Sequence, residues 1–196
     1  MQKIIEKLTV PKVILRYIMM NFTDIQTIEN VILNVKIMNV LDNYSQDILI
    51  KAKNGFLRNC ENGYLTVAKW LYNIGGVDIH AENELEFAWS CNNGHLAIAQ
   101  WLYSLGNVNI HAENEAAFRW SCNNGHLAVA QWLYGLGNVN IHAKNEAAFT
   151  WSCNSGHLAV AQWLYGLGNV NIHANNEYVF HYCDAMILNW LQTIKN

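Results

Sequence analysis

The sequence predicts an all-α solenoid: a row of short helix pairs with short extended connectors and a helical cap at both ends. One observation is a cysteine that returns at a constant spacing, at Cys60, Cys91, Cys122 and Cys153. Another is the segment Glu115–Tyr134, which recurs as Glu146–Tyr165 with two changes and more divergently as Glu84–Tyr103. A helix pair of this size cannot bury its own apolar faces, so neighbouring copies must stack.

Composition excludes several classes of protein. The 196 residues are 52% hydrophobic and carry a formal net charge of only −3, which excludes an intrinsically disordered chain. No apolar run approaches the 18 or so residues that a membrane span needs, so we expect no membrane partner. The apolar stretch Val13–Met20 is interrupted by Arg16 and precedes no small-residue cleavage site, so we expect a protein that is not secreted.

The first helix of each copy is expected near residues 115–123. Phe118 and Cys122 are four residues apart, and Ala117 and Trp120 broaden this apolar face. The dipeptide Asn124-Gly125 should end the helix, because both residue types tolerate the left-handed backbone conformation found at helix ends.

The second helix is expected near residues 127–135, with Leu127, Ala130, Leu133 and Tyr134 at helical spacing. The following segment 138–143 alternates apolar and polar residues and is interpreted as an extended connector. Small Ala130 beside large Trp132 conserves the volume of a packed layer, so we interpret most of the eight tryptophans as structural.

The motif Asn-Gly-His-Leu at residues 124–127, followed by Trp-Leu-Tyr and a Gly-Asn-Val-Asn-Ile-His-Ala connector, resembles the ankyrin repeat. The resemblance implies three domains or segments: a helical cap or degenerate repeat at 1–50, repeats at 51–176 and a truncated capping repeat at 177–196. The Asn-rich, Pro-poor form is similar to the ankyrin arrays of giant DNA viruses of amoebae. It implies a non-catalytic scaffold in the host cytoplasm that binds a host or viral protein, with the oligomeric state left open.

The sequence departs from the family pattern in two places, at the start of the first helix and in the length of the connector. Glu-Ala-Ala-Phe replaces the usual Thr-Pro-Leu-His. The period is also shorter than the family norm, about 31 residues against about 33 residues. We therefore expect a tight loop in place of the family's long hairpin finger. The Asn-Glu pair at 114–115 is expected to supply a helix N-cap and a favourably placed negative charge.

The N-terminal segment is open to two interpretations. It can be a degenerate capping repeat, since Thr23-Asp24 could cap an amphipathic helix that follows. Alternatively, the segment Val10–Ile18 resembles the proline-led first helix of the F-box family, which implies a substrate adaptor for a host ubiquitin ligase through residues 1–45. Lys12 stands where that family has an acidic residue.

Charge is divided unevenly along the chain. Residues 1–70 hold nine Lys/Arg and six Asp/Glu, a net charge of +3, whereas residues 71–196 hold three and nine, a net charge of −6. An acidic array repels phosphate, so we expect no nucleic-acid partner.

Several repeated polar residues could suggest metal or enzyme chemistry. The Cys-x3-His spacing, as in Cys122 and His126, is compatible with zinc, but stacked repeats place such residues in parallel columns rather than around one point. The histidines at 80, 111, 142 and 173 are interpreted as a polar ladder between loops. The serines at 90, 121 and 152 are interpreted as helix-packing residues, and no nucleophile and base converge. We expect no catalysis, no cofactor and no metal.

What remains is recognition, and the positions that differ between copies are the candidates for it. Positions that vary and are expected to be exposed, together with the asparagines of the turns, form the predicted partner-binding set. Its members are Glu82, Glu86, Asn92, Asn93, Glu113, Arg119, Asn123, Asn124, Lys144, Thr150 and Asn154. The alternative is that these positions vary because nothing depends on them.

Overall fold

The computed structural model describes residues 55–74 and 77–194, and within them every regular element is a helix. Residues 55–61 are helical and precede the labelled helices. These are α5 (Leu65–Ile74), α6 (Ala81–Asn92), α7 (Leu96–Ser104), α8 (Ala112–Asn123), α9 (Leu127–Gly135), α10 (Ala143–Asn154), α11 (Leu158–Gly166), α12 (Ala174–Tyr182) and α13 (Ala185–Ile194). The N-terminal cap predicted at 1–50 and the F-box-like segment lie outside the described residues.

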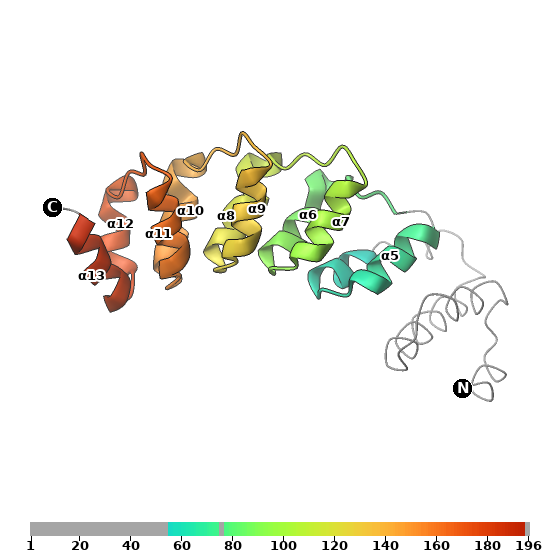
Figure 1. Ribbon diagram of the computed structural model, residues 1–196, viewed down its shortest axis with the longest axis horizontal. Helices are drawn as coiled ribbons and strands as arrows, with labels where there is room; N and C mark the ends of the chain where they lie inside the picture. Colours follow the sequence, from blue (N-terminus) through green and yellow to red (C-terminus); the bar gives the residue numbers. More distant parts are fainter. Residues whose placement is uncertain (1–54, 75–76, 195–196) are drawn as a thin grey trace, which may run out of the picture. The chain divides into compact units, whose positions relative to one another are not determined.

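The chain divides into two compact units, and the second, residues 57–68 and 78–196, contains the repeats. In this unit the pairs α6–α7, α8–α9, α10–α11 and α12–α13 stand side by side (Figure 1). The first helices of successive pairs are direct neighbours: α6 packs on α8, α8 on α10 and α10 on α12. The predicted all-α stack of helix pairs is confirmed.

The core follows the predicted periodicity of the first helix. Phe118 and Cys122 are fully buried in α8, as are their equivalents in α6 and α10. In α9 the buried residues are Val129, Ala130 and Leu133, while Tyr134 is exposed. The expectation that Tyr134 belongs to the buried face of the second helix is therefore wrong, since the helix turns its Val129 side to the core.

The glycine in the turn between the two helices is required for two reasons: its backbone conformation and its close contact with the next repeat. Gly125 has φ +76°, and a Cβ there would lie 2.5 Å from Nδ1 of His157 in the next repeat. The turn histidine thus packs on the glycine of the preceding turn, and Gly63 and Gly94 meet His95 and His126 in the same way. The ring of His95 also donates from Nε2 to the carbonyl of Glu61 at 2.9 Å, so this histidine ties two successive turns together.

The tryptophans of the second helices join neighbouring layers. Trp132 of α9 lies 6.2 Å from the ring of Phe87 in α6 and 5.9 Å, edge-on, from Tyr103 in α7. Trp163 and Trp190 repeat this arrangement on the next two layers. The structural interpretation of the tryptophans is confirmed for this column.

The cysteine column lies in the core as predicted. Cys60, Cys91, Cys122 and Cys153 are buried and unbridged, and burial raises the pKa of each thiol, to about 12 for Cys153. Within residues 55–74 and 77–194 no group of three or more His, Cys, Asp or Glu side chains is placed to hold a metal ion.

The last pair departs from the repeat. Helix α12 ends at Tyr182, and Cys183 is extended instead of forming the Asn-x-Gly-His turn. Asp184 then starts α13, because its Oδ1 accepts the N–H of Ile187 at 2.8 Å. A capping role for residues 177–196 stays a prediction. None of the described helices is long and apolar enough to cross a membrane.

Candidate partner-binding surface

The solvent-facing side of α6, α8 and α10 carries one tryptophan per layer: Trp89, Trp120 and Trp151. We call this side the first-helix face. All three rings are only partly buried, and the rings of Trp89 and Trp120 lie 5.9 Å apart. These tryptophans are part-buried, as Trp132 is, and they also join layers, since Trp120 contacts Trp89 and Trp151 lies under Arg119 of the preceding layer. The sequence indicates this solvent-facing orientation, because each tryptophan directly precedes the buried Ser-Cys pair and therefore points away from the buried side of the helix.

The turn asparagines lie together at one end of the helix pairs. The side chain of Asn124 donates to both the carbonyl and the Oδ1 of Asn92 in the preceding repeat, each at 2.8 Å. Ser155 donates in the same way to Oδ1 of Asn123 at 3.2 Å. Asn124 and Asn154 are exposed, whereas Asn92, Asn93 and Asn123 are partly buried. These amides therefore form a polar strip that links the turns and still faces solvent.

At the other end of the helix pairs, each first helix begins with a left-handed turn. Glu113, Asn114 and Glu115 have φ values of 51°, 56° and 65°, and residues 82–84 and 144–146 repeat this conformation. The left-handed region costs an L-residue about 1–2 kcal/mol, so a run of three needs support from elsewhere in the fold. No hairpin finger occurs in the described connectors, which is the tight loop expected from the short period.

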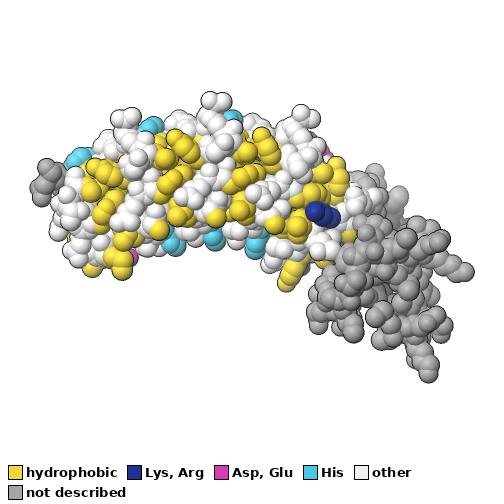
Figure 2. Space-filling model, in the orientation of Figure 1, with side chains coloured by type: hydrophobic (Ala, Val, Ile, Leu, Met, Phe, Trp, Pro, Cys, Tyr) yellow, Lys and Arg dark blue, Asp and Glu magenta, His cyan; other side chains and the backbone are white. Residues whose placement is uncertain are grey.

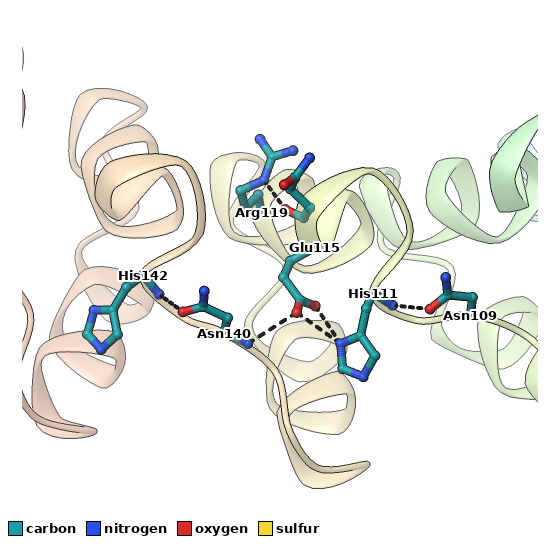
Figure 3. A network of polar contacts seen from close by, with 7 residues as sticks. Asn109, His111, Glu115, Arg119, Asn140 and His142 are labelled. Atoms are coloured by element: carbon teal, nitrogen blue, oxygen red, sulfur yellow. Dashed lines mark hydrogen bonds and ion pairs between the residues drawn. The ribbon is translucent and has the colours of Figure 1, made fainter.

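In α6, α8 and α10 a buried glutamate supports the turn, as Figure 3 shows for Glu115. The carboxylate of Glu115 accepts Nδ1–H of His111 at 2.9 Å and the backbone N–H of Asn140, in the next connector, at 3.2 Å. Glu84 and Glu146 make the same two bonds one layer earlier and one layer later. The predicted N-cap role of the Asn-Glu pair is wrong, because no side chain caps these helices and the glutamate instead bridges two repeats.

The predicted ladder between loops thus exists, with the glutamate as its link. In each connector the residue two positions before the histidine also accepts its backbone N–H, as Asn109 Oδ1 does for His111 at 3.1 Å. Figure 2 shows histidine side chains along both long edges of the array, with hydrophobic side chains gathered between them.

Burial lowers the pKa of the turn histidine His126, while its bond to the backbone of Asn92 acts in the opposite direction.

Three residues of the predicted partner-binding set are buried, and their assignment as exposed contacts is wrong. Glu86 is 1% exposed, Arg119 7% and Thr150 3%. Position 86 shares its place in the repeat with Ala117 in the core, and positions 119 and 150 lie on the side of the helix that packs between layers. Variation between copies at these positions reflects packing between layers.

The other charged members of the set are exposed. Glu82, Glu113 and Lys144 each occupy the first left-handed position of their turn. The side chain of Asn83 donates to Oε1 of Glu113 at 2.7 Å, which links two turns across the layers. The predicted set is therefore divided between two ends of the first-helix face, with the tryptophans between them.

Arg119 is held by its own turn and by the next layer. Its Nε donates to the carbonyl of Asn114 at 2.8 Å and its Nη2 to the carbonyl of Glu113 at 2.9 Å. Its guanidinium carbon lies 5.2 Å from the centre of the Trp151 ring, in reach of a cation–π contact. Burial lowers the pKa of this guanidinium, and the nearby Glu115 and Glu113 carboxylates act against that shift.

Residues 87–176 match the family model described as Ankyrin repeats (3 copies). This match and the stacked helix pairs together make the fold an ankyrin-type solenoid. Ankyrin repeats are in general non-catalytic modules that mediate protein–protein interaction. No curated protein matches the chain.

Proposed function

We propose that the protein is a non-catalytic scaffold that binds a partner protein, of the host or of a virus, through its first-helix face. The observation that carries this proposal is the row of partly exposed tryptophans Trp89, Trp120 and Trp151. Tryptophan is enriched among the residues that dominate binding energy at protein interfaces. The exposed parts of these three rings follow one another along the array, and an apolar surface of this kind is typical of an interaction site.

The surroundings of the tryptophans support a protein partner. The exposed amides of Asn124 and Asn154 lie at one end of the face and the charges of Glu82, Glu113 and Lys144 at the other. An apolar centre with a polar rim is the usual composition of a protein interface. The acidic excess of residues 71–196 disfavours a polyanionic ligand such as nucleic acid.

The test is affinity capture by the full chain from a lysate of the cells in which it acts, with bound proteins measured by mass spectrometry. Trp89→Ala removes one ring of the row, and Gln131→Ala, at an exposed position of α9, is the matched control. We expect a partner that is captured by the wild type and by Gln131→Ala and lost with Trp89→Ala. Circular dichroism of each variant verifies that its helices remain.

The partner could instead be retained by Trp89→Ala and by Trp120→Ala and be lost when the second helices are altered at Gln100, Gln131 and Gln162. The binding surface would then lie on the other side of the array. That result overturns the assignment of the first-helix face.

The second candidate is a substrate adaptor for a host ubiquitin ligase. It is supported by the resemblance of Val10–Ile18 to the first helix of the F-box family. Capture of ligase scaffold proteins by the full chain, lost on deletion of residues 1–20, is the expected result for an adaptor. Scaffold proteins that are still bound after this deletion contradict it.

A further inference from the structure

Two successive layers differ at one position of the first helix. In α8 this position is Arg119, whose guanidinium rests over Trp151 and donates to the carbonyls of Glu113 and Asn114. In α6 the equivalent position, one repeat earlier, is Ala88. An alanine has no atoms that could reach the places the guanidinium occupies one layer on.

The space that Ala88 leaves is a cleft between α6 and α8. The residues that line it include Glu82, Asn83, Ala88 and Trp120. These are the equivalents, one layer earlier, of Glu113, Asn114, Arg119 and Trp151. The cleft therefore has the turn backbone and the aromatic ring that hold Arg119, without the arginine.

The charge of the cleft suits a cation. Among the described residues, its lining contains the carboxylates of Glu82, Glu84 and Glu113 and no lysine or arginine. Glu113 is exposed at the rim, where it can attract a cation from solvent, while Glu84 is buried and bonded to His80. Ala88, Ala116 and Leu85 supply apolar walls for the aliphatic part of a long side chain.

We infer that this cleft receives an arginine side chain of the partner protein, with its guanidinium over Trp120 and against the left-handed turn at Glu82 and Asn83. The inference rests on the proposed function and names the group that the first-helix face recognises. Arginine fits better than lysine because the internal example uses two donors of one planar fork on successive carbonyls, and a guanidinium stacks on an indole.

The test follows the indole N–H signals of the full 15N-labelled chain during titration with Nα-acetyl-arginine amide. The matched probe is Nα-acetyl-citrulline amide, which has the same shape without the charge. We expect a saturable shift of the Trp120 indole that needs at least about tenfold more citrulline derivative than arginine derivative, as loss of a cation–π contact and of charged hydrogen bonds predicts. Equal response to the two probes overturns the inference.

Two variants test the site in opposite directions. Ala88→Arg should fill the cleft from within, as Arg119 does one layer on, and abolish the Trp120 response. Arg119→Ala should open a second cleft, so that the Trp151 indole now also responds to the arginine derivative. An unchanged Trp120 response in Ala88→Arg, or a Trp151 that stays silent in a folded Arg119→Ala, contradicts the inference.

The Ala88→Arg variant also separates this inference from the proposed function. Capture of the partner that is lost with Trp89→Ala and with Ala88→Arg supports both. Capture that is lost with Trp89→Ala and kept by Ala88→Arg retains the binding face and overturns the arginine site. Capture kept by both variants overturns both.

Discussion

The ring of His157 lies against Gly125 of the preceding turn so closely that a Cβ on the glycine would be 2.5 Å from Nδ1. The contact joins residues of successive repeats, and Gly63 with His95 and Gly94 with His126 make the same contact in the preceding layers. The glycine is needed for its positive φ and for the room that the next histidine takes.

Gly125→Ala should therefore destabilise the protein, because it adds a clash to a left-handed backbone. The conformational cost alone is about 1–2 kcal/mol, and displacement of the His157 ring adds to it. Chemical denaturation followed by circular dichroism measures the loss. Gly135→Ala is the matched control, since a Cβ on Gly135 would have no neighbour within 4 Å and its φ is ordinary. A loss as large at Gly135 as at Gly125 contradicts the explanation.

Removal of the buried carboxylate should weaken the link between two layers. Glu115→Ala leaves the N–H of Asn140 and the ring of His111 without their acceptor, and we expect a loss of about 1–3 kcal/mol in the free energy of unfolding. Glu177→Ala is the control. The Glu177 side chain is 49% exposed and its bond to His173 lies at the surface, so its loss should stay within about 1 kcal/mol. Equal losses in the two variants would contradict the bridging role of Glu115.

Stability should fall as the pH rises above about 8.5, the ordinary pKa of a thiol. Burial raises the pKa of the folded-state thiols Cys60, Cys91, Cys122 and Cys153, so they stay protonated while those of the unfolded chain ionise. The unfolded state then binds fewer protons, and each thiol can remove up to about 1.4 kcal/mol per pH unit. Denaturation at pH 8 and pH 10 measures the slope, and Cys122→Ala should reduce it. An equal slope in the two proteins contradicts the prediction.

Trp132→Ala should destabilise the array, because this ring contacts both Phe87 and Tyr103 of the preceding layer. The side chain is only partly buried, so the expected loss is about 2–3 kcal/mol, below the 3–5 kcal/mol typical of a fully buried aromatic. Trp132→Phe keeps an aromatic ring between the two layers and should cost less. A loss near zero for Trp132→Ala would place the ring outside the packing between layers.

The stack of helix pairs and most of its core follow from the amino-acid sequence alone. The pattern shows Phe118 and Cys122 on one face of a helix, with a glycine turn after it, at a constant repeat period. The helix and its buried face follow from local backbone preferences and from burial. Both are properties of a single repeat, so they can be recognised in one copy and verified in the others.

The burial of Arg119 and part of the support of the left-handed turns, by contrast, depend on contacts between repeats that no single copy reveals. The run of positive φ at Glu113–Glu115 is held within one repeat by the bond of Glu115 to His111, and between repeats by its bond to Asn140 in the next connector. Arg119 is likewise buried because Trp151, in the following repeat, lies beneath its guanidinium. Contacts between layers join residues about one repeat apart. Whether a side chain on the first-helix face is buried or exposed therefore depends on the residue that lies opposite it in the neighbouring repeat.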